Sequence, residues 1–393
     1  MLLSTQLRSV VELRYGINPH QSGRILNSIE QQPFRIINGN MSYVNILDAA
    51  HSWQLVREVR SAIDRPTAAS FKHVSPAGVA IAGDLDSTTV ATWGHDCAEF
   101  TGVASAYVRA RDCDPRSSFG DMVAVSDPVD ADLAHFLTGV VSDGIIAPGF
   151  EAGTVATLTR KKRGAFLVLE ADTTFDPPAR ERRDILGLTV EQDRDQTPIT
   201  TELLTVVEGK ALTEQSIRDA LLGLVTMRYT QSNSVAFIHD GATVGIGAGQ
   251  QSRVDCTRLA AAKTSTWWTR RSDSVRSLAR PDGMTRQDHV NWQMRLIEGD
   301  PTPLEVSAFM HRFGFEPTPL PTEERANWIG ELDNVTMVSD GFLPFRDNVD
   351  HASRVGTRHI VEPGGSVRTI DVATACSELG IDLIHTGLRL FHH

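Results

Sequence analysis

The chain has 393 residues, 41% hydrophobic and 22% charged, which is the composition of a globular protein long enough for two or three domains. Its 38 Lys and Arg residues are outnumbered by 49 Asp and Glu residues, which argues against a nucleic-acid partner, so an anionic ligand would need a local group of cations. We find no signal core and no apolar run of about 20 residues, so we expect a cytoplasmic protein without a membrane partner.

The first motif in chain order is RYGINPHQ at residues 14–21, which precedes any predicted core element. Taken alone, the turn-forming Asn18-Pro19 pair favours a polar N-terminal arm. The alternative is a phosphate clamp, because the Arg14 guanidinium matches phosphate oxygens and Tyr15 adds a donor. The residues themselves leave both interpretations open.

A helix is predicted over residues 48–63, with Asp48 as its capping residue and Pro66 as its stop. A buried strand follows over residues 68–74 and brings Lys72 and His73 to its end. Side chains alternate along a strand, so this cation and this imidazole act together only if the chain leaves the pleat there. We expect residues 75–78 (SPAG) to form that turn, at the sheet edge where α/β enzymes place their chemistry.

Helices followed by short apolar strands recur along the chain, which predicts an α/β protein. The helices are predicted at 130–141, 213–229 and 371–379, and the strands at 145–147, 235–238 and 383–385. The polar stretch 173–205 is interpreted as a connection between two halves. The sequence VSDG occurs at 141–144 and at 338–341, and its expected position at equivalent strand ends suggests duplication.

The segment 230–253 holds a second group of polar and glycine residues. Residues 230–234 (TQSNS) lie between a helix and a strand, and Asp240-Gly241 predicts a hairpin. The glycines that follow lack the spacing and the acidic residue of a dinucleotide site. We interpret Gly245, Gly247 and Gly249 as positions where the backbone approaches a ligand, and Arg253 as the start of a helix whose amides favour an anion.

Two apolar segments near the C-terminus complete the pattern. In residues 342–348 (FLPFRDN), one interpretation buries Phe345 and pairs Arg346 with Asp347 at the surface, and the other is a slot in which Asp347 binds a flat heterocycle. Residues 386–393 would form a disordered tail by default, but their apolar side chains predict that the tail docks. The four cysteines are far apart and predict neither a zinc site nor a disulfide framework.

In order, these segments resemble the formyltransferase part of the bifunctional purine enzymes that include 5-aminoimidazole-4-carboxamide ribonucleotide (AICAR) transformylase. The matching motifs are RYGxNPHQ at 14–21, FKHVSPAG at 71–78, SSFGD at 117–121, SDGIIAPG at 142–149, TQSNS at 230–234, GAGQQSR at 247–253, FRDNVD at 345–350 and LRLFHH at 388–393. The family's fused cyclohydrolase domain would precede Met1 and is not in the sequence, so we expect that this chain does not close the purine ring.

The resemblance implies a fold, partners and a reaction. The fold is two zinc-free cytidine-deaminase-like α/β/α units, at residues 1–203 and 204–393, in a homodimer with shared active sites. The reaction transfers the formyl group of 10-formyltetrahydrofolate to the 5-amino group of AICAR and gives FAICAR. Two alternatives remain: a paralogue that formylates a related aminoimidazole nucleotide, and a nucleotide-binding regulator without turnover.

The resemblance also implies the site residues. His73 is the expected base, and Lys72 and Asn233 are expected to stabilise the oxyanion. The expected substrate-binding residues are Arg14, Tyr15, Asn45, Phe119, Gly120, Asp143, Arg253 and Arg389. The expected folate-binding residues are Phe342, Pro344, Phe345 and Asp347. No catalytic metal is expected, but a monovalent cation such as K⁺ is implied near Thr230, Ser232, Ser234 and Asp340.

Overall fold

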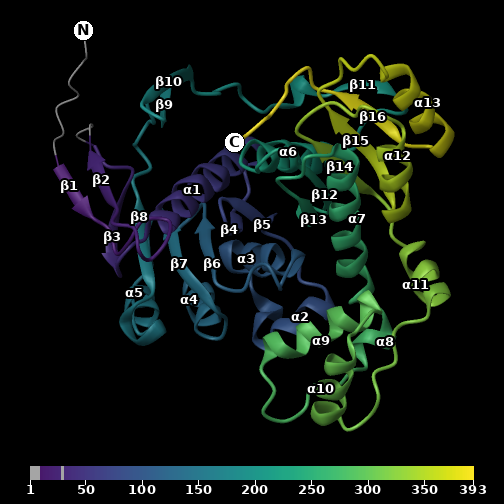
Figure 1. Cartoon of the computed structure of the whole chain (residues 1–393), viewed down its shortest axis with the longest axis horizontal. Coiled ribbons are helices and arrows are strands. Elements are labelled where there is room, and N and C mark those ends of the chain that lie inside the picture. Colours follow the sequence, from purple (N-terminus) through teal and green to yellow (C-terminus); the bar gives the residue numbers. More distant parts are fainter. Residues whose placement is uncertain (1–8, 28–30) are drawn as a thin grey trace.

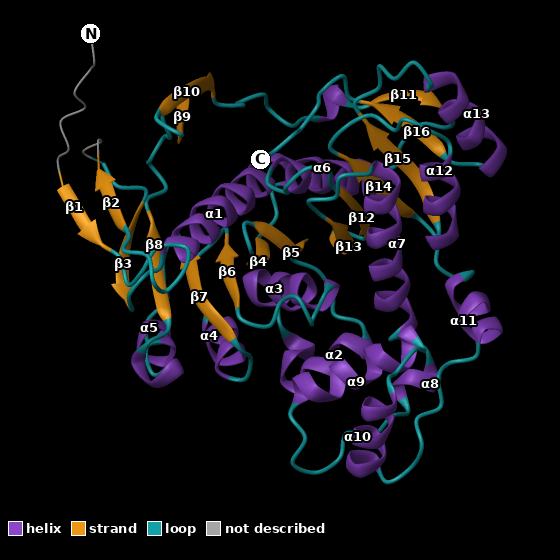
Figure 2. Ribbon diagram, viewed as in Figure 1, coloured by secondary structure: helices purple, strands orange, loops and turns teal. Residues whose placement is uncertain are grey.

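The structure is a computed structural model that describes residues 9–27 and 31–393. Its centre is one large mixed sheet covered by helices (Figures 1 and 2). From edge to edge, the strands are β11 (Thr205–Glu208), β16 (Asp382–His385), β15 (Thr357–Glu362), β14 (Val335–Ser339), β12 (Val235–His239), β13 (Ala242–Gly247), β5 (Ser75–Ile81), β4 (Thr67–Lys72), β6 (Asp121–Val125), β7 (Ser142–Ala147), β8 (Leu167–Ala171) and β3 (Phe34–Asn38). The predicted α/β class is therefore confirmed.

Two long helices cover one face of the sheet and two cover the other. Helices α1 (Tyr43–Ile63) and α6 (Glu214–Arg228) lie side by side on one face, and a single core beneath them draws on strands of both halves of the sheet (Figure 1). Helices α3 (Gly102–Cys113) and α7 (Arg253–Thr269) pack on the opposite face over two separate cores.

The other helices of the described residues have 4 to 13 residues. They are α2 (Ser87–Trp93), α4 (Ala131–Thr138), α5 (Thr154–Leu158), α8 (Asp273–Arg276), α9 (Arg286–Glu298), α10 (Pro303–Phe313), α11 (Thr322–Ile329), α12 (Asp347–Ala352) and α13 (Thr369–Leu379). Short 3₁₀ helices span His95–Glu99, Lys161–Gly164, Thr201–Leu203 and Ser353–Val355. Helices α8 to α11 form a lobe away from the main sheet (Figure 1), with a small core of its own around Trp292 and Phe309. No sequence pattern predicted this lobe.

The strand order repeats on the two sides of the sheet's centre. Outward from β5 it runs β5-β4-β6-β7-β8-β3, and outward from β13 it runs β13-β12-β14-β15-β16-β11. In each series two antiparallel pairings are followed by two parallel pairings and one antiparallel pairing. Because β13 pairs with β5 antiparallel, the two series run in opposite directions. The edge where β4, β13 and β14 end is therefore the edge where β6, β7 and β12 begin.

This order corrects the expected position of the repeated VSDG motif. Ser142 begins β7, whereas Ser339 ends β14, so the two copies do not lie at equivalent strand ends. The counterpart of β14 in the other series is β6, which is followed by Ser126 and Asp127. By register, Val125 and Ser126 correspond to Ser339 and Asp340, so the VSDG match joined positions that are not equivalent.

Helix α1 begins five residues earlier than predicted. Ser42 is its capping residue, and the side chains of Ser42 and Asn45 each accept a hydrogen bond from the other's backbone amide. This capping box satisfies amides that the first turn leaves free. Asp48, predicted as the cap, instead lies buried inside the helix. The helix ends at Asp64, two residues before Pro66.

The turn after Lys72 also differs from the prediction. It consists of His73 and Val74, which both have left-handed backbones with φ of 54° and 59°. Ser75 already pairs with Lys72 in β5, so residues 75–78 belong to a strand and not to a turn. The chain does leave the pleat beside Lys72, as the function of the pair requires, but it does so at His73 itself.

The stretch 173–205 contains a hairpin that the sequence did not indicate. Strands β9 (Arg180–Ile185) and β10 (Leu188–Asp193) pair antiparallel away from the main sheet, and every residue in them is exposed (Figure 1). A strand with no buried face shows no hydrophobic alternation, which explains the miss. A second small hairpin joins β1 (Ser9–Glu12) and β2 (Arg24–Asn27).

The four cysteines, Cys97, Cys113, Cys256 and Cys376, are free and buried. Among residues 9–27 and 31–393, we find no helix that is long and apolar enough to cross a membrane.

Candidate active site

Lys72 and His73 lie at the sheet edge described above. The Lys72 Nζ donates to the carbonyl of Phe119, and the carbonyl of Gly120 is 3.5 Å away. Gly120 has a left-handed φ of 79°, and a Cβ there would come 3.1 Å from the Lys72 Nζ, so a side chain would crowd the lysine. The His73 side chain is exposed and not sealed in the core. The side chains of Lys72 and His73 can therefore both contact a ligand at this sheet edge.

Asp48 of α1 lies directly beneath this turn, a position that the sequence did not predict. Its side chain is 6% exposed, and its Oδ1 accepts a hydrogen bond of 2.7 Å from the Val74 amide. Burial raises the pKa of Asp48 to about 6, although the Val74 amide and the nearby His73 favour its charged form. Asp48 lies on the same face of α1 as the buried Leu55. This spacing was the sequence signal that could have identified Asp48 as a buried carboxylate.

Asn233 is held by the loops around it. Its Nδ2 donates to the Gln250 carbonyl at 2.8 Å, and its Oδ1 accepts from the Arg253 Nη2 at 2.7 Å. Arg253 in turn forms a buried ion pair with Asp340. The Asn233 amide therefore fixes this loop in the structure, and it can bind an oxyanion only if one of its N–H groups turns towards a ligand.

Three distant segments meet around residues 230–234. The Gln231 amide donates to the Ser75 Oγ at 3.3 Å, which joins this loop to the His73 turn. Ser232 exchanges two hydrogen bonds with His392, its amide donating at 3.0 Å and its Oγ accepting at 3.1 Å. The Leu390 amide donates to the Asp340 carbonyl at 2.8 Å. These contacts confirm that the C-terminal tail docks.

The glycines of residues 245–249 have a different role from the one predicted. A Cβ at Gly245 would come 2.4 Å from the Ala260 carbonyl oxygen, and a Cβ at Gly247 would come 2.6 Å from that of Cys256. Both glycines therefore allow β13 to pack closely on α7. The interpretation of these two positions as a ligand approach was wrong, whereas Arg253 does begin α7 as predicted.

The remaining predicted nucleotide residues lie in two places. Asp143 lies beside Gly120, since a Cβ at Gly120 would come 3.9 Å from the Asp143 Oδ1. The same carboxylate forms an ion pair with the Lys162 Nζ at 2.5 Å. Arg14 donates to the Tyr15 hydroxyl at 2.7 Å, and the Tyr15 carbonyl accepts from the Tyr43 amide at the start of α1.

The predicted phosphate clamp is not assembled within the described residues. Asn45, at the same end of α1, is occupied in the capping box. Arg389 is exposed and lies over the Phe391 ring, with its Cζ 4.6 Å from the centroid. In the described part of the chain, we find no hydrogen bond or ion pair that joins Arg14 or Tyr15 to Arg389.

Two exposed phenylalanines, Phe342 and Phe345, follow the end of β14 at this sheet edge. Phe342 is 47% exposed and Phe345 57% exposed, so the interpretation of Phe345 as a core residue was wrong. The loop between them is fixed because the buried Glu362 carboxylate accepts from the Leu343 amide at 2.6 Å. Phe391 packs against Gly341, since a Cβ there would come 2.7 Å from its ring. Such exposed aromatic surface is typical of a ligand or partner site.

Asp347 and Arg346 do not form the surface pair that one interpretation proposed. Arg346 pairs with Asp350 and Glu378, at 3.1 and 3.0 Å. The Asp347 Oδ1 accepts from the Asn348 Nδ2 at 2.8 Å at the start of α12. Asp347 is only half-buried, so its carboxylate remains accessible to a ligand.

The group predicted to hold a monovalent cation lies beside Arg253. The Asp340 carboxylate accepts from the Ser232 hydroxyl and from the Ser234 amide. The Ser234 Oγ is buried without a hydrogen-bond partner. Within residues 9–27 and 31–393, no group of three or more His, Cys, Asp or Glu side chains is arranged to hold a metal ion.

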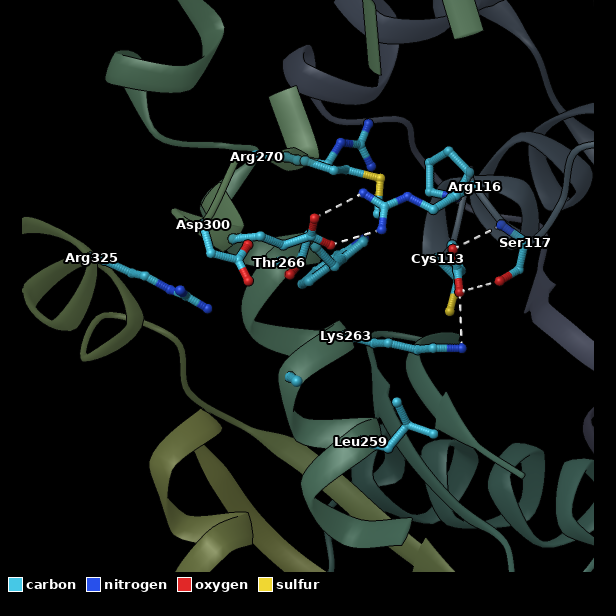
Figure 3. Close-up of a pocket in the computed structure, with 15 residues that line it drawn as sticks. Cys113, Arg116, Ser117, Leu259, Lys263, Thr266, Arg270, Asp300 and Arg325 are labelled. Atoms are coloured by element: carbon cyan, nitrogen blue, oxygen red, sulfur yellow. Dashed lines mark hydrogen bonds and ion pairs between the residues drawn. The ribbon is translucent and has the colours of Figure 1, made fainter. Parts of the chain in front are cut away.

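Two cavities flank Arg116. One, of about 600 Å³, lies between residues 113–117 and α7, where Lys263 binds Asp114 at 2.9 Å and Arg116 binds Glu298 at 2.8 Å (Figure 3). Its lining includes none of the predicted site residues. The other, of about 580 Å³, includes Phe119 in its lining and so borders the candidate site.

The fold and the edge together define an α/β protein whose mixed sheet presents a lysine–histidine turn beside exposed aromatic rings. Residues 2–263 match the family described as AICARFT/IMPCHase bienzyme. The chain belongs to this family.

Relatives agree with the family match. The bifunctional purine biosynthesis protein PurH of Roseobacter denitrificans is 30% identical over 388 residues, which cover 97% of this chain and 59% of that protein. The PurH proteins of Dinoroseobacter shibae and Rhodospirillum rubrum are also 30% identical, with the same coverage. The chain thus spans about three fifths of the length of these relatives.

Proposed function

We propose that this chain transfers the formyl group of 10-formyltetrahydrofolate to the 5-amino group of AICAR and forms FAICAR. The observation that carries the proposal is the exposed His73 beside Lys72, at an edge where Phe119, the loop 230–234 and the C-terminal tail converge. Family membership supports the same reaction. The free cysteines suit a reducing cytoplasm.

His73 acts as the base in this proposal. The 5-amino group of the substrate is a weak nucleophile because its lone pair is conjugated with the ring and the carboxamide. His73 removes the amine proton as the nitrogen attacks the formyl carbon. Lys72 and one N–H of Asn233 stabilise the oxyanion that forms, and Lys72 then donates a proton to the departing N10.

The other predicted residues bind the two substrates. Arg14, Tyr15 and Arg389 bind the phosphate of the nucleotide, with Arg14 paired to the Tyr15 hydroxyl and so held ready. Asn45, Phe119, Gly120, Asp143 and Arg253 surround its base and sugar. Phe342, Pro344 and Phe345 form the wall of the pterin slot, in which Asp347 accepts from the ring nitrogens.

We also propose that the chain is two cytidine-deaminase-like units, residues 1–203 and 204–393, in a homodimer. The repeated strand order supports the duplication. The exposed hairpin β9–β10 supports the dimer, since an isolated two-stranded hairpin is barely stable in water and this one exposes Leu186, Leu188 and Val190. A partner subunit that covers this hairpin would also bring together binding residues that are separate in one chain.

A K⁺ ion near Asp340 is the last part of the proposal. Hydroxyl and carboxylate oxygens are suitable ligands for such an ion, and the partnerless Ser234 Oγ is one of them. Thr230, Ser232 and Asp340 would supply the others. The melting temperature of the protein should then be higher in KCl than in an equal concentration of tetramethylammonium chloride. This difference between the two salts should be smaller for Ser234→Ala.

The test of the reaction uses the purified chain with AICAR and 10-formyltetrahydrofolate, and follows tetrahydrofolate release by absorbance. We expect turnover that is lowered roughly 100- to 10,000-fold by His73→Ala, because a general base contributes a factor of this size. AICAR binding should persist in the variant, and His311→Ala on exposed α10 is the matched control.

A related aminoimidazole nucleotide that competes with a higher kcat/KM would identify a paralogue, and a wild-type chain that binds AICAR without turnover would refute the proposal.

A further inference from the structure

The two central hairpins of the sheet are anchored in the same way. Asp48 stands five residues after the start of α1, and Asp219 stands five residues after the start of α6. Asp48 accepts from the Val74 amide at 2.7 Å, and Asp219 accepts from the Gly241 amide at 2.6 Å. The first amide belongs to the β4–β5 turn and the second to the β12–β13 turn. A buried aspartate beneath a hairpin is therefore repeated in both halves.

Both turns have a left-handed backbone at their two central residues. The φ angles are 54° and 59° at His73 and Val74, and 47° and 73° at Asp240 and Gly241. The ladder of a two-residue hairpin does not use the amide of the second central residue, so the aspartate satisfies a group that is otherwise unpaired.

The first turn needs this anchor more than the second. Glycine adopts a positive φ at little cost, whereas valine is β-branched and strained there. Strained residues persist only where the surroundings hold them, and such positions are concentrated at functional sites. Val74 directly follows His73, so the backbone conformation of Val74 also determines the direction of the His73 imidazole.

We propose that Asp48 is a positioning residue of the active site, which holds the left-handed His73–Val74 turn and thereby directs the His73 imidazole to the same side as Lys72. The inference rests on the proposed function. Asp219 carries out the same anchoring at the opposite edge of the sheet, where the turn is His239-Asp240-Gly241. It provides a structural control without a catalytic role.

The charge of Asp48 gives a second readout. The ionisable groups that face it are Lys72 at the end of β4, His73 in the turn and Asp143 in β7. Asp48→Asn retains an oxygen acceptor for the Val74 amide but removes the carboxylate. Asp48→Ala removes both.

The test compares Asp48→Ala, Asp48→Asn, Asp219→Ala and Asp219→Asn in the full chain. For Asp48→Ala we expect kcat to fall roughly 100-fold, as misplacement of a catalytic group by about 1 Å does, while KM for AICAR stays close to wild type. Asp48→Asn should keep most of kcat and displace the pH profile. Asp219→Ala should lower the melting temperature as Asp48→Ala does, with kcat unchanged. Equal loss of kcat in the two alanine variants would overturn the inference.

A rescue variant covers the case in which Asp48→Ala does not fold. Glycine at position 74 accepts a φ of 59° without strain, so Asp48→Ala with Val74→Gly should fold and recover part of kcat. If the double variant folds but recovers none of the lost kcat, Asp48 does not act on His73 through the conformation of this turn.

A spectroscopic readout separates this inference from the reaction itself. The imidazole ¹⁵N signals of His73 should move in Asp48→Ala and stay in place in Asp219→Ala, whether or not the chain turns over AICAR. An inactive wild-type chain with this pattern would reject the proposed function and retain Asp48 as the anchor. Unmoved His73 signals in Asp48→Ala would reject the anchor.

Discussion

Arg253 and Asp340 form an ion pair that is almost completely shielded from water, with side chains 7% and 0% exposed. The same guanidinium donates to the Asn233 side chain at 2.7 Å and to the Ser234 carbonyl at 3.1 Å. One buried cation thus holds the start of α7, the end of β14 and the loop that contains Asn233.

Removal of one partner of this pair should be far more costly than removal of both. Arg253→Met leaves the Asp340 charge buried and unpaired, so we expect the free energy of unfolding to fall by about 3–5 kcal/mol. Adding Asp340→Asn should restore part of this loss. Urea unfolding of the two single variants and the double variant measures the coupling, and strictly additive losses would contradict it.

Arg389→Ala should chiefly weaken nucleotide binding. A lost charge-assisted contact to a phosphate costs about 1.5–3 kcal/mol, and kcat at saturating AICAR should change little. Calorimetric titration with AICAR gives the affinity, with Arg312→Ala on exposed α10 as the control. A titration curve like that of the wild type would remove Arg389 from the clamp.

The contribution of three buried carboxyl groups to stability should fall as the pH rises through the neutral range. Burial raises the pKa of Asp48 to about 6 and that of Asp219 and Glu362 to about 7. At these three groups the native state therefore binds protons that the unfolded state has already lost, so their contribution to the free energy of unfolding decreases between about pH 4 and pH 8.

Urea midpoints across this pH range measure the slope. Asp219→Asn keeps the acceptor for the Gly241 amide, and its stability relative to the wild type should increase as the pH rises towards 8. A difference between the two proteins that does not change with pH would show that Asp219 is ionised in the native state.

A charge on the β9–β10 hairpin should weaken the proposed dimer. Leu188→Asp introduces a carboxylate where we expect contact with the second subunit, whereas Val367→Asp places the same charge at a fully exposed position elsewhere. Sedimentation velocity should show monomer for the first variant and dimer for the second. Dimer in both variants would exclude the hairpin from the interface.

Local patterns in the sequence sufficed for several elements. The helices predicted from residues 130 and 213 are present as α4 and α6, with Asp130 and Thr213 as their caps, and Asp240-Gly241 turns between β12 and β13 as predicted. The apolar tail docks as its composition indicates. These features depend on neighbours within a few positions, so they can be recognised from short segments.

Other features escaped the sequence because they depend on distant partners. The turn at His73-Val74 contains neither glycine nor asparagine, and the carboxylate that accepts from its Val74 amide belongs to Asp48, 26 positions away. The exposed hairpin β9–β10 buries no face and leaves no periodic signal. Helices α9 and α10 of the lobe pack on a small core of their own.

The sequence by itself determined the α/β class, the family and the identity of the candidate residues, because each of these is encoded in local patterns and motifs. Only the tertiary structure decided that the Lys72-His73 turn, residues 230–234 and the C-terminal tail share one edge. The physical reason is the antiparallel pairing of β13 with β5, which reverses one half of the sheet against the other. Strand ends of the second half thereby meet strand beginnings of the first, which a linear pattern does not specify.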